Sequence, residues 1–311
     1  MESTPCPMCG ANAGRLLFEG HDLLHHGEGT FRQNTCRTCG HIYQNPRPSI
    51  EQIGRYYPQN YMPFLKAIED EPNWWKRLDR RYGRSRRCQA VHKAAGEVGR
   101  LLDVGCATGI FLDGMRTLGW QVAGVEPTAS AVEYARTRFA LDVFEGRLEE
   151  APFADHSFDV ITLWDVLEHV HEPKQVLAKI HQLLRPGGLL VMSLPNPDSI
   201  EARLLGPYWA GWDLPRHLNL FRPRQLRQHL PQMGFEINKI RSFTAGYSVL
   251  IMSIEHKRNA EGHDGKRVGR ILRAWPLRLL AKLYYNGPAS WLNLSSIMVV
   301  FASSNGICDT Q

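Results

Sequence analysis

The sequence lacks several features that would assign it to other classes of protein. Its first residues, MESTPCPMCG, contain no basic segment followed by an apolar run, so they do not resemble a secretory signal. No apolar stretch reaches the length of about 20 residues that a membrane-spanning helix needs. Low-complexity tracts and fixed-period repeats are also missing, which argues against a disordered chain or a solenoid. We therefore expect a globular protein of the cytoplasm.

The composition is that of an ordinary globular protein. Of 311 residues, 43% are hydrophobic and 22% are charged. In a reducing compartment the seven cysteines are expected to be thiols or metal ligands rather than disulfides. The net charge of +6 permits an acidic partner, a phosphate-bearing substrate or an anionic membrane surface, but it identifies none of them.

The chain divides into three parts. Residues 1–48 carry four of the cysteines and end at the proline-rich NPRPS. Residues 49–98 form a basic and aromatic bridging segment with helical spacing. In residues 99–311 short apolar runs alternate with amphipathic stretches, a pattern that predicts strands alternating with helices. Such units build a parallel sheet that helices cover on both faces.

A glycine-rich turn follows the first predicted strand, in LLDVGCATG at 101–109. Gly105 and Gly109 let the backbone approach a ligand closely, and the helix that begins near Gly109 favours electron-rich groups at its N-terminus. The second strand ends at Glu126, 23 residues after Asp103, where a carboxylate can accept both hydroxyls of a ribose. The G-x-G-x-x-G spacing of dinucleotide-binding proteins is missing, so the glycines indicate another adenosine cofactor.

From about residue 100 to residue 240 the chain resembles the class I S-adenosylmethionine-dependent methyltransferases. In that family an acid at the strand end precedes G-x-G-x-G or a close variant, as DVGCATG does here. The stretches GVEP, EGRLEEAPFADHSFDVITLWDVLEHVHEP and LLRPGGLLVMSLPN follow in the family's order. The resemblance implies an α/β fold with a Rossmann-like, doubly wound, seven-stranded mixed sheet, whose last strands would be FEINKIRSF and SSIMVVFAS. A Rossmann-like domain without methyltransferase activity is the alternative.

The same resemblance implies roles for individual residues. Asp103 would anchor the turn near the methionine moiety, and Glu126 would bind the ribose. Two positions depart from the pattern: Ala107 stands where many members have glycine, and Arg147 where many have an acid beside the adenine. Adenine recognition would then rest on the Leu148 backbone and on apolar walls. The residues expected to bind the cofactor are Asp103, Gly105, Cys106, Gly109, Glu126, Leu148 and Trp164.

Two C-x-x-C-G knuckles lie 26 residues apart near the N-terminus, in CPMCG and CRTCG. Two such knuckles bring four thiolates into a tetrahedral shell, and the arrangement resembles a zinc ribbon. Because a closed four-thiolate site has no open position, we expect a structural role for the zinc; a redox dithiol is the alternative. The expected zinc ligands are Cys6, Cys9, Cys36 and Cys39, whereas Cys88, Cys106 and Cys308 are expected to be small buried residues.

The stretch LWDVLEHVHEP at 163–173 carries the expected chemistry, because the loop after the fourth strand faces the transferred methyl group in this fold. The ordinary pKa of histidine, near 6.5, suits His169 for removing a proton from an acceptor. His217, after the fifth strand, is a second candidate, and Glu168 is the third residue expected to be catalytic. The alternative is that Glu168 caps or orients while His169 packs structurally.

A divalent ion is a further hypothesis for this site. Asp165, Glu168 and His169 are three and four residues apart, so they would share one face of a helix, and His217 would complete the set. Some quinone-pathway and small-RNA 2′-O-methyltransferases look similar, with E-x-x-E-H and a later histidine. Such ligands would suit Mg²⁺. Because an aspartate replaces the first glutamate, proton abstraction without a metal remains our first expectation.

The acceptor is not readable from the sequence. GPYWAGWDLPRHLNLF resembles a region of bacterial methyltransferases of sugar or cell-surface polymer pathways, where Trp209 and Trp212 would line an acceptor pocket; core packing explains them equally well. We expect O- or C-methylation of a small-molecule, sugar or lipid-linked acceptor. Ranked below it are a nucleic-acid-binding protein or RNA methyltransferase, using the ribbon and residues 66–87, and a membrane-associated scaffold without activity.

A basic amphipathic insertion is predicted at about 262–290, between the last two strands. In GKRVGRILRAWPLRLLAKLYYNG, residues 265–287, apolar residues recur at three- and four-residue intervals among six arginines and lysines. Pro276 is expected to break the segment into two helices. A lid or subunit interface is slightly favoured over a peripheral contact with the inner face of the membrane.

Overall fold

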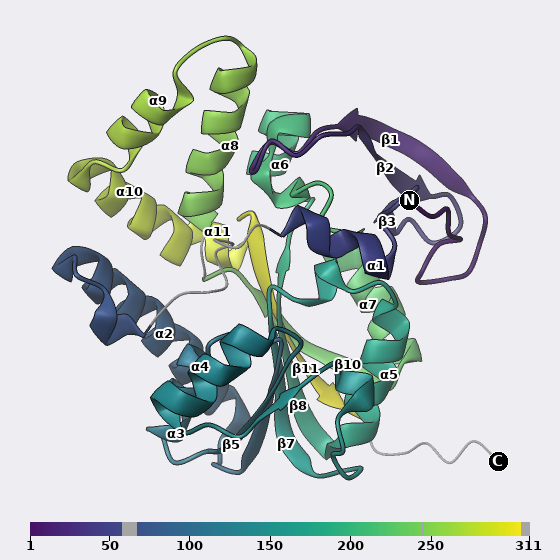
Figure 1. Ribbon diagram of the computed structural model, residues 1–311, viewed down its shortest axis with the longest axis vertical. Helices are drawn as coiled ribbons and strands as arrows, with labels where there is room; N and C mark the ends of the chain where they lie inside the picture. Colours follow the sequence, from purple (N-terminus) through teal and green to yellow (C-terminus); the bar gives the residue numbers. More distant parts are fainter. Residues whose placement is uncertain (58–66, 244–245, 306–311) are drawn as a thin grey trace.

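A seven-stranded sheet with helices on both faces forms the main body of the computed structural model, which describes residues 1–57, 67–243 and 246–305 (Figure 1). The strand order is β10-β11-β8-β7-β4-β5-β6. This architecture confirms the predicted Rossmann-like mixed sheet. In that order the strands are Phe235–Arg241, Ile297–Ser304, Leu184–Pro195, Phe158–Trp164, Arg100–Val104, Gln121–Glu126 and Val143–Glu145.

The direction of the strands determines where a ligand can bind. β4 runs parallel to both of its neighbours, β5 and β7, while β11 runs antiparallel to β8 and β10. The chain leaves β4 towards β5 on one side and returns to β7 on the other. In open α/β sheets such a reversal of strand order opens a crevice beyond the carboxyl ends of the strands. The glycine-rich turn lies at this point.

Alternating residues of the central strands build one core on each face of the sheet. Leu102, Ile161 and Met192 pack on one face, against α5 and α7, whereas Leu101 and Val160 pack on the other, against α2, α3 and α4. Burial on both faces explains why these strands are continuous apolar runs in the sequence. The helices are α2 (Trp74–Ala95), α3 (Ile110–Arg116), α4 (Ala129–Phe139), α5 (Pro173–Leu183) and α7 (Pro223–Gln232).

Short helices and single turns connect these elements. None of the helices in the described part of the chain is long and apolar enough to cross a membrane. The short elements are α1 (Ile50–Ile53), α6 (Ile200–Leu205) and the 3₁₀ turns η1 (Gly54–Tyr56), η2 (Ile68–Asp70), η3 (Leu148–Glu150), η4 (Leu167–His169), η5 (Gly206–Tyr208) and η6 (Ala210–Trp212).

The N-terminal module contains a second, antiparallel sheet. Its strands are β1 (Gly14–Gly20), β2 (Phe31–Cys36) and β3 (Ile42–Gln44), and β3 pairs with β9 (Asn219–Leu220), which comes from the chain after β8. Cys6, Met8 and Tyr43 of the module also belong to the same buried cluster as the main sheet. The module is therefore joined to the main domain by both backbone pairing and a shared core.

A buried ionic network also joins the two parts. The guanidinium of Arg216 is fully buried and lies 2.8 Å from Asp22 Oδ1, in the loop between β1 and β2, and 2.6 Å from Asp213 Oδ1. It also donates to the carbonyl oxygen of Tyr56, at 3.1 Å. A buried charge that loses a partner is costly, so this network requires the module, the bridging segment and the main domain together.

Four helices separate the last two strands: α8 (Gly246–Ala260), α9 (Gly265–Leu272), α10 (Trp275–Asn286) and α11 (Pro288–Trp291). The helical segment between these strands begins earlier than the predicted insertion, with α8. The sequence did not predict α8, because its apolar run shows no single helical face. Two helices occur in the predicted segment, as expected. Pro276 lies in the first turn of the second helix, α10, where its missing N–H costs nothing, and the chain turns at Arg273 and Ala274 between the two.

The ionic network predicts the effect of Asp22→Asn on stability. Burial opposes ionisation of Asp22, but hydrogen bonds from Arg216 outweigh it and keep the pKa of the carboxyl below 3.8. We expect the variant to lose about 3 kcal/mol of unfolding free energy at neutral pH, measured by urea unfolding. A carboxyl with a lowered pKa stabilises the fold above its unfolded pKa, so the difference from wild type should disappear as the pH falls below about 4.

Glu19→Gln is the matched control, because Glu19 pairs with Arg32 at 2.7 Å in the same module but on its surface. Exposed pairs contribute about 1 kcal/mol or less. Equal effects of the two substitutions would contradict a special role for the buried network.

Candidate functional site

The turn after β4 has a backbone that glycine makes possible. Gly105 has φ of +69° and Gly109 of +77°, a region that side chains disfavour. A Cβ at Gly105 would lie 2.6 Å from Val166 Cγ2, and one at Gly109 would lie 2.4 Å from Leu141 Cδ1. Ala107 also has a positive φ, +48°, which costs about 1 kcal/mol for a residue with a side chain. Many members of the family that the sequence resembles have glycine at this position.

The carboxylate of Glu126 connects the end of β5 to this turn. Its Oε2 accepts a hydrogen bond from the backbone N–H of Ala107 at 2.9 Å, and its Oε1 accepts one from Thr128 at 3.0 Å. A carboxylate offers about four acceptor positions, so further donors can bind. Glu126 is thus held at the carboxyl end of its strand, beside the glycine-rich turn.

Asp103 lies under the turn rather than on its surface. Its side chain is buried and accepts a hydrogen bond from Thr162 Oγ1 of β7, at 2.5 Å. Burial raises the pKa of Asp103 to about 7, although the Thr162 hydroxyl acts against this rise. The side chain therefore connects β4 to β7 directly below the crevice.

Three other residues expected at the cofactor differ in their surroundings. Cys106 is buried, and its Sγ packs against Gly124 so closely that a Cβ added at Gly124 would lie 2.6 Å from the sulfur. The side chain of Cys106 therefore packs into the core, while its backbone belongs to the turn. Leu148 is buried in η3, just after β6. Trp164 ends β7 and belongs to the core of the opposite face, with its ring against Phe111.

Leu148 and Trp164 lie on different parts of the sheet. Leu148 follows β6 and Trp164 ends β7, with β4 and β5 between these strands, and the two side chains belong to different faces of the sheet. The guanidinium of Arg87, on α2, lies 4.9 Å from the indole centroid of Trp164. Contact of Trp164 with the adenine stays a prediction.

Glu168, His169 and His217 form a cluster at the carboxyl end of the sheet. Glu168 and His169 belong to η4, directly after β7, and His217 precedes β9. Each offers one ligand atom, and these atoms lie within 4.8 Å of one another. The two imidazole rings meet edge to face, with centroids 4.7 Å apart. The structure thus brings together three of the four residues of the predicted ion site.

Hydrogen bonds determine which ring nitrogen of each histidine carries the proton. Nδ1 of His217 lies 2.8 Å from the carbonyl oxygen of Gly211, and Nδ1 of His169 lies 3.1 Å from that of Arg216 and 3.0 Å from the Tyr57 hydroxyl. A carbonyl only accepts, so each Nδ1 is assigned the proton. Nε2 of each ring then has a lone pair for a proton or a cation.

Glu168 is the unusual member of the cluster. Its side chain is fully buried, and among the described residues neither carboxylate oxygen has a hydrogen-bond partner. Burial, followed by the nearby negative charge of Asp165, raises the pKa of Glu168 well above its usual value of 4.5. An unpaired buried carboxylate is costly in a folded protein, so a proton or a cation is needed here.

Asp165 does not join this cluster, contrary to the prediction from its spacing. Its Oδ1 accepts a hydrogen bond from Ser193 Oγ at 2.7 Å, and its Oδ2 lies 3.6 Å from a guanidinium nitrogen of Arg87. The predicted helical face does not exist, because Asp165 has φ of +57° and η4 is a single turn that begins at Leu167. A three-residue spacing places side chains together only within a continuous helix.

Trp209 and Trp212 are core residues rather than walls of an open pocket. They are 1% and 8% exposed, and their indole nitrogens donate to Ser296 Oγ and to the carbonyl oxygen of Gly206. Phe18 of the N-terminal module packs edge-on against Trp212, with centroids 4.7 Å apart. Of the predicted acceptor contacts, only His217 reaches the cluster.

Several residues beside the cluster had no signal in the sequence. Tyr57 of the bridging segment reaches His169, and Asp213 Oδ2 lies 3.8 Å from His217 Nε2. Arg87 reaches Asp165 from α2. Each of these residues is an ordinary surface type in its local context, and only long-range packing brings it to the site.

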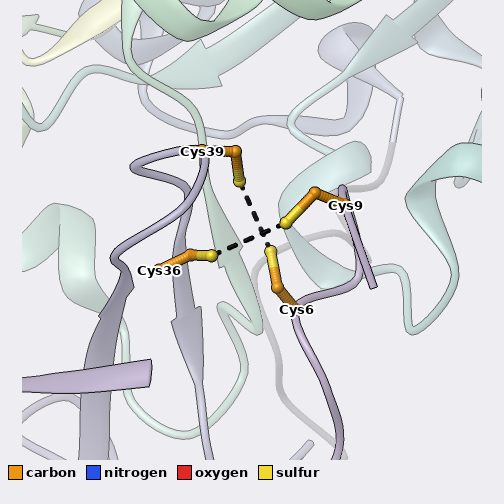
Figure 2. A group of neighbouring side chains, drawn as sticks. All are labelled: Cys6, Cys9, Cys36 and Cys39. Carbon is orange, nitrogen blue, oxygen red and sulfur yellow. Dashed lines mark hydrogen bonds between the residues drawn. The ribbon is translucent and has the colours of Figure 1, made fainter. Parts of the chain in front are cut away.

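The four cysteines of the two knuckles converge at one point of the module (Figure 2). Sγ atoms lie 3.6 Å apart in the pairs Cys6–Cys39 and Cys9–Cys36, and all four lie within 4.8 Å. Four ligands at the usual Zn–S length form a tetrahedron with edges of about 3.8 Å. The spacing therefore fits a zinc ion. Among the other cysteines, Cys88 and Cys106 are buried as predicted, and Cys308 lies outside the described residues.

Comparisons with known proteins show the family to which this fold belongs. The model of the methyltransferase domain family matches residues 74–240, more than half of the chain. A probable S-adenosylmethionine-dependent methyltransferase of Mycolicibacterium smegmatis is 27% identical over 219 residues, which cover 70% of this chain and 76% of that protein.

Shorter matches involve enzymes named for ubiquinone biosynthesis. The mitochondrial O-methyltransferase of Schizosaccharomyces pombe is 38% identical over 113 residues, which span 34% of this chain and 41% of that protein. The enzyme of Aromatoleum aromaticum is 31% identical over 160 residues, 47% of this chain and 68% of that protein.

A crystal structure of a possible histamine N-methyltransferase from Thermotoga maritima superposes with a TM-score of 0.46 and 19% identity, covering 75% of this chain and 97% of that one. The family match covers the parallel strands β4 to β8, the glycine-rich turn and the loop with the histidine and glutamate cluster, whereas β11 lies outside it. The chain therefore belongs to the methyltransferase domain family and is a class I S-adenosylmethionine-dependent methyltransferase.

Proposed function

We propose that this methyltransferase transfers the methyl group to a hydroxyl oxygen of a small-molecule acceptor, either free or carried on a sugar or lipid. The observation that carries the proposal is the cluster of Glu168, His169 and His217 at the carboxyl end of the sheet, with its unpartnered carboxylate. A hydroxyl must lose its proton on methylation, and this cluster supplies groups that can take it. The relatives named as ubiquinone O-methyltransferases also support an oxygen acceptor.

The crevice beyond β4 fits the cofactor. The positive-φ backbone of Gly105 and Gly109 leaves no side chain between the turn and a ligand, and Glu126 would accept hydrogen bonds from ribose hydroxyls. Asp103 would hold β4 and β7 in place below the methionine moiety, and the Leu148 backbone would contact the adenine. When bound, the cofactor supplies a methyl group already activated on a sulfonium.

His169 and His217 would act on the acceptor proton. Burial, followed by the charge of His217, lowers the pKa of His169 to about 3, so this imidazole is neutral at physiological pH. Burial also lowers the pKa of His217. Both rings therefore have a lone pair available to accept a proton or to hold a positive ion, and their Nδ1 contacts keep the rings in fixed orientations.

A divalent cation fits the donor set of the same cluster. Glu168 needs a positive partner, and the two imidazoles are neutral ligands. With Asp165 paired elsewhere, two nitrogens and one carboxylate suit Mn²⁺, Fe²⁺ or Zn²⁺ better than the predicted Mg²⁺, which prefers oxygen. Bound there, such an ion would orient the acceptor hydroxyl and lower its pKa.

Zinc on Cys6, Cys9, Cys36 and Cys39 would have a structural role. Four thiolates leave no open coordination position, and the knuckles support β3, whose partner β9 follows His217 directly in the chain. The module would thus stabilise one wall of the proposed acceptor site. This arrangement gives the module a role in the chain without a nucleic-acid ligand.

The ribose assignment predicts the effect of Glu126→Ala on cofactor affinity. Loss of charge-assisted hydrogen bonds should weaken binding of S-adenosylhomocysteine by about 1 to 3 kcal/mol, measured by titration calorimetry. Glu145→Ala is the control, because Glu145 is an exposed carboxylate at the end of the neighbouring strand β6. Equal affinity in the Glu126 variant and wild type would remove this residue from the ribose site.

The cation assignment predicts that Glu168→Gln separates stability from binding. A neutral amide is less costly to bury than an unpaired carboxylate, so the metal-free variant should be at least as stable as wild type in thermal unfolding. Mn²⁺, which does not compete for the four-cysteine site, should raise the Tm of wild type but not of the variant. If no divalent ion raises the wild-type Tm, the cluster acts without a metal and Glu168 is a neutral acid.

The methylation chemistry predicts that His169→Ala lowers turnover by about 100-fold or more while S-adenosylhomocysteine affinity stays unchanged. Product is detected by the mass of one added methyl group, and the position of that methyl group in the product shows whether the acceptor atom is oxygen. His171→Ala is the control, because His171 Nε2 binds the Pro48 carbonyl away from the cluster. Full activity of the His169 variant would exclude the proposed role, and methylation at carbon or nitrogen would refute the hydroxyl acceptor.

The zinc assignment predicts one zinc per chain by elemental analysis of protein purified without added metal. Cys36→Ser should release it, whereas Cys88→Ser should retain it, because Cys88 is buried in the other core. Since the module shares a sheet and a core with the main domain, the zinc-free variant should also have a lower Tm for the whole chain. Unchanged zinc content in Cys36→Ser would be inconsistent with the site.

A further inference from the structure

Exposed apolar side chains are concentrated on two distant parts of the sequence. Of the 18 large hydrophobic residues that are exposed in the described chain, twelve lie either in the first half of α2 or between residues 271 and 292. Exposed fractions reach 59% at Trp74, 66% at Leu283 and 70% at Trp291. A cluster of this size on a protein surface marks an interaction site rather than ordinary exposure.

The two parts lie next to each other, since α2 and α10 are neighbours in the fold (Figure 1). A guanidinium nitrogen of Arg278, on α10, is 3.3 Å from Asp79 Oδ2, in the second turn of α2. On α2, Trp75, Leu78 and Tyr82 follow helical spacing along one face, and the rings of Trp74 and Trp75 are stacked. We call the surface formed by exposed side chains of residues 74–82 and 271–292 the apolar face.

The helices that carry the apolar face are strongly basic. Together, α2 and residues 265–286 contain fourteen lysines and arginines and one aspartate. The whole chain has 37 basic and 31 acidic residues, so the remainder holds 23 basic against 30 acidic residues. A chain with a modest net charge therefore concentrates its positive charge beside its exposed apolar residues.

We propose that the apolar face docks this enzyme peripherally on an anionic lipid bilayer. Leucines such as Leu280 and Leu283 would enter the region of the acyl chains, tryptophans would lie at the interface, and arginines such as Arg270 would contact lipid phosphates.

Other occupants fit less well. A second copy of the chain would bring two strongly positive surfaces together, which opposes association. Nucleic acid would satisfy the arginines but would leave the exposed leucines in water. A lid would cover its own apolar side, whereas Leu280 is 63% exposed here.

The apolar face also borders the proposed acceptor side of the enzyme. From α2, Arg87 reaches Trp164 and Asp165 at the end of β7, and from α10 the Tyr285 hydroxyl donates to Glu201 Oε1 of α6, after β8, at 2.6 Å. Docking would place this end of the sheet near the bilayer. Resting on the proposed function, this position favours a lipid-linked hydroxyl acceptor.

Vesicle flotation of the full chain tests the docking. Vesicles of phosphatidylcholine with increasing phosphatidylglycerol are the probe, and we expect binding that rises with anionic lipid and falls in high salt. Leu280→Glu with Leu283→Glu should weaken partitioning by about tenfold or more, since both changes oppose insertion. Acyl-chain-brominated lipid should quench tryptophan fluorescence of wild type, and less so after Trp74→Ala with Trp75→Ala.

Matched controls lie elsewhere on the surface. Leu16→Glu changes an exposed leucine of β1 and should leave binding unchanged, whereas Arg267→Glu with Arg270→Glu should weaken it and Arg224→Glu should not. Circular dichroism melting verifies that each variant is folded, and S-adenosylhomocysteine affinity reports the cofactor site separately.

Three outcomes would overturn the proposal. The first is absence of flotation at every lipid composition. The second is a dimer in solution that the leucine substitutions dissociate, which would make the face a subunit interface. The third is tight oligonucleotide binding that the arginine substitutions abolish while vesicles do not bind. None of these outcomes depends on methyl transfer, so failure of the docking and failure of the proposed function are distinguishable.

Discussion

The arrangement of the N-terminal module on the main domain depends on the ion pairs and hydrogen bonds of the buried Arg216 guanidinium. It joins a carboxylate of the N-terminal module, Asp22, to one of the main domain, Asp213, and it holds the carbonyl of Tyr56. A charge removed from water requires complete compensation, and only these segments together provide it. The next residue is His217, and the Arg216 carbonyl contacts His169, so both rings of the cluster are positioned by the same network.

Glu168 and Arg216 show two different consequences of burial. Both side chains are fully buried, yet Arg216 has carboxylate partners on two sides while the described residues offer none to the oxygens of Glu168. The carboxylates of Asp22 and Asp213 thus offset the desolvation cost of Arg216, whereas the desolvation cost of Glu168, after β7, is not offset by a hydrogen-bond partner among the described residues. An unmet buried charge is common at sites that bind a ligand or move a proton, because the missing partner arrives with the ligand.

Different segments of the chain form the cofactor crevice, the histidine and glutamate cluster and the apolar face. The glycine-rich turn and Glu126 belong to the first two strand-to-helix connections, whereas the cluster belongs to later ones. The apolar face comes from helices outside the sheet, in the bridging segment and in the insertion between β10 and β11. Insertions between strands leave the core unchanged, so they can add a docking surface without altering the crevice.

Sequence alone determined the features that depend on neighbouring residues. The strand-and-helix alternation, the glycine-rich turn and the two cysteine knuckles were predicted from local spacing, whereas the positions of β10 and β11 were implied by the family resemblance. Tertiary structure decided the features that join distant residues. Arg216 and Asp22 are 194 positions apart, and α2 meets α10 across a similar separation.

The prediction for Asp165 failed for the same reason. Asp165 was assigned to the cluster from its spacing, but the single turn of η4 places it elsewhere. Spacing specifies a direction only once the local backbone is known. The sequence therefore determined which chemistry the chain carries, and the packing decided which side chains share a site, because contacts between distant segments depend on the whole core.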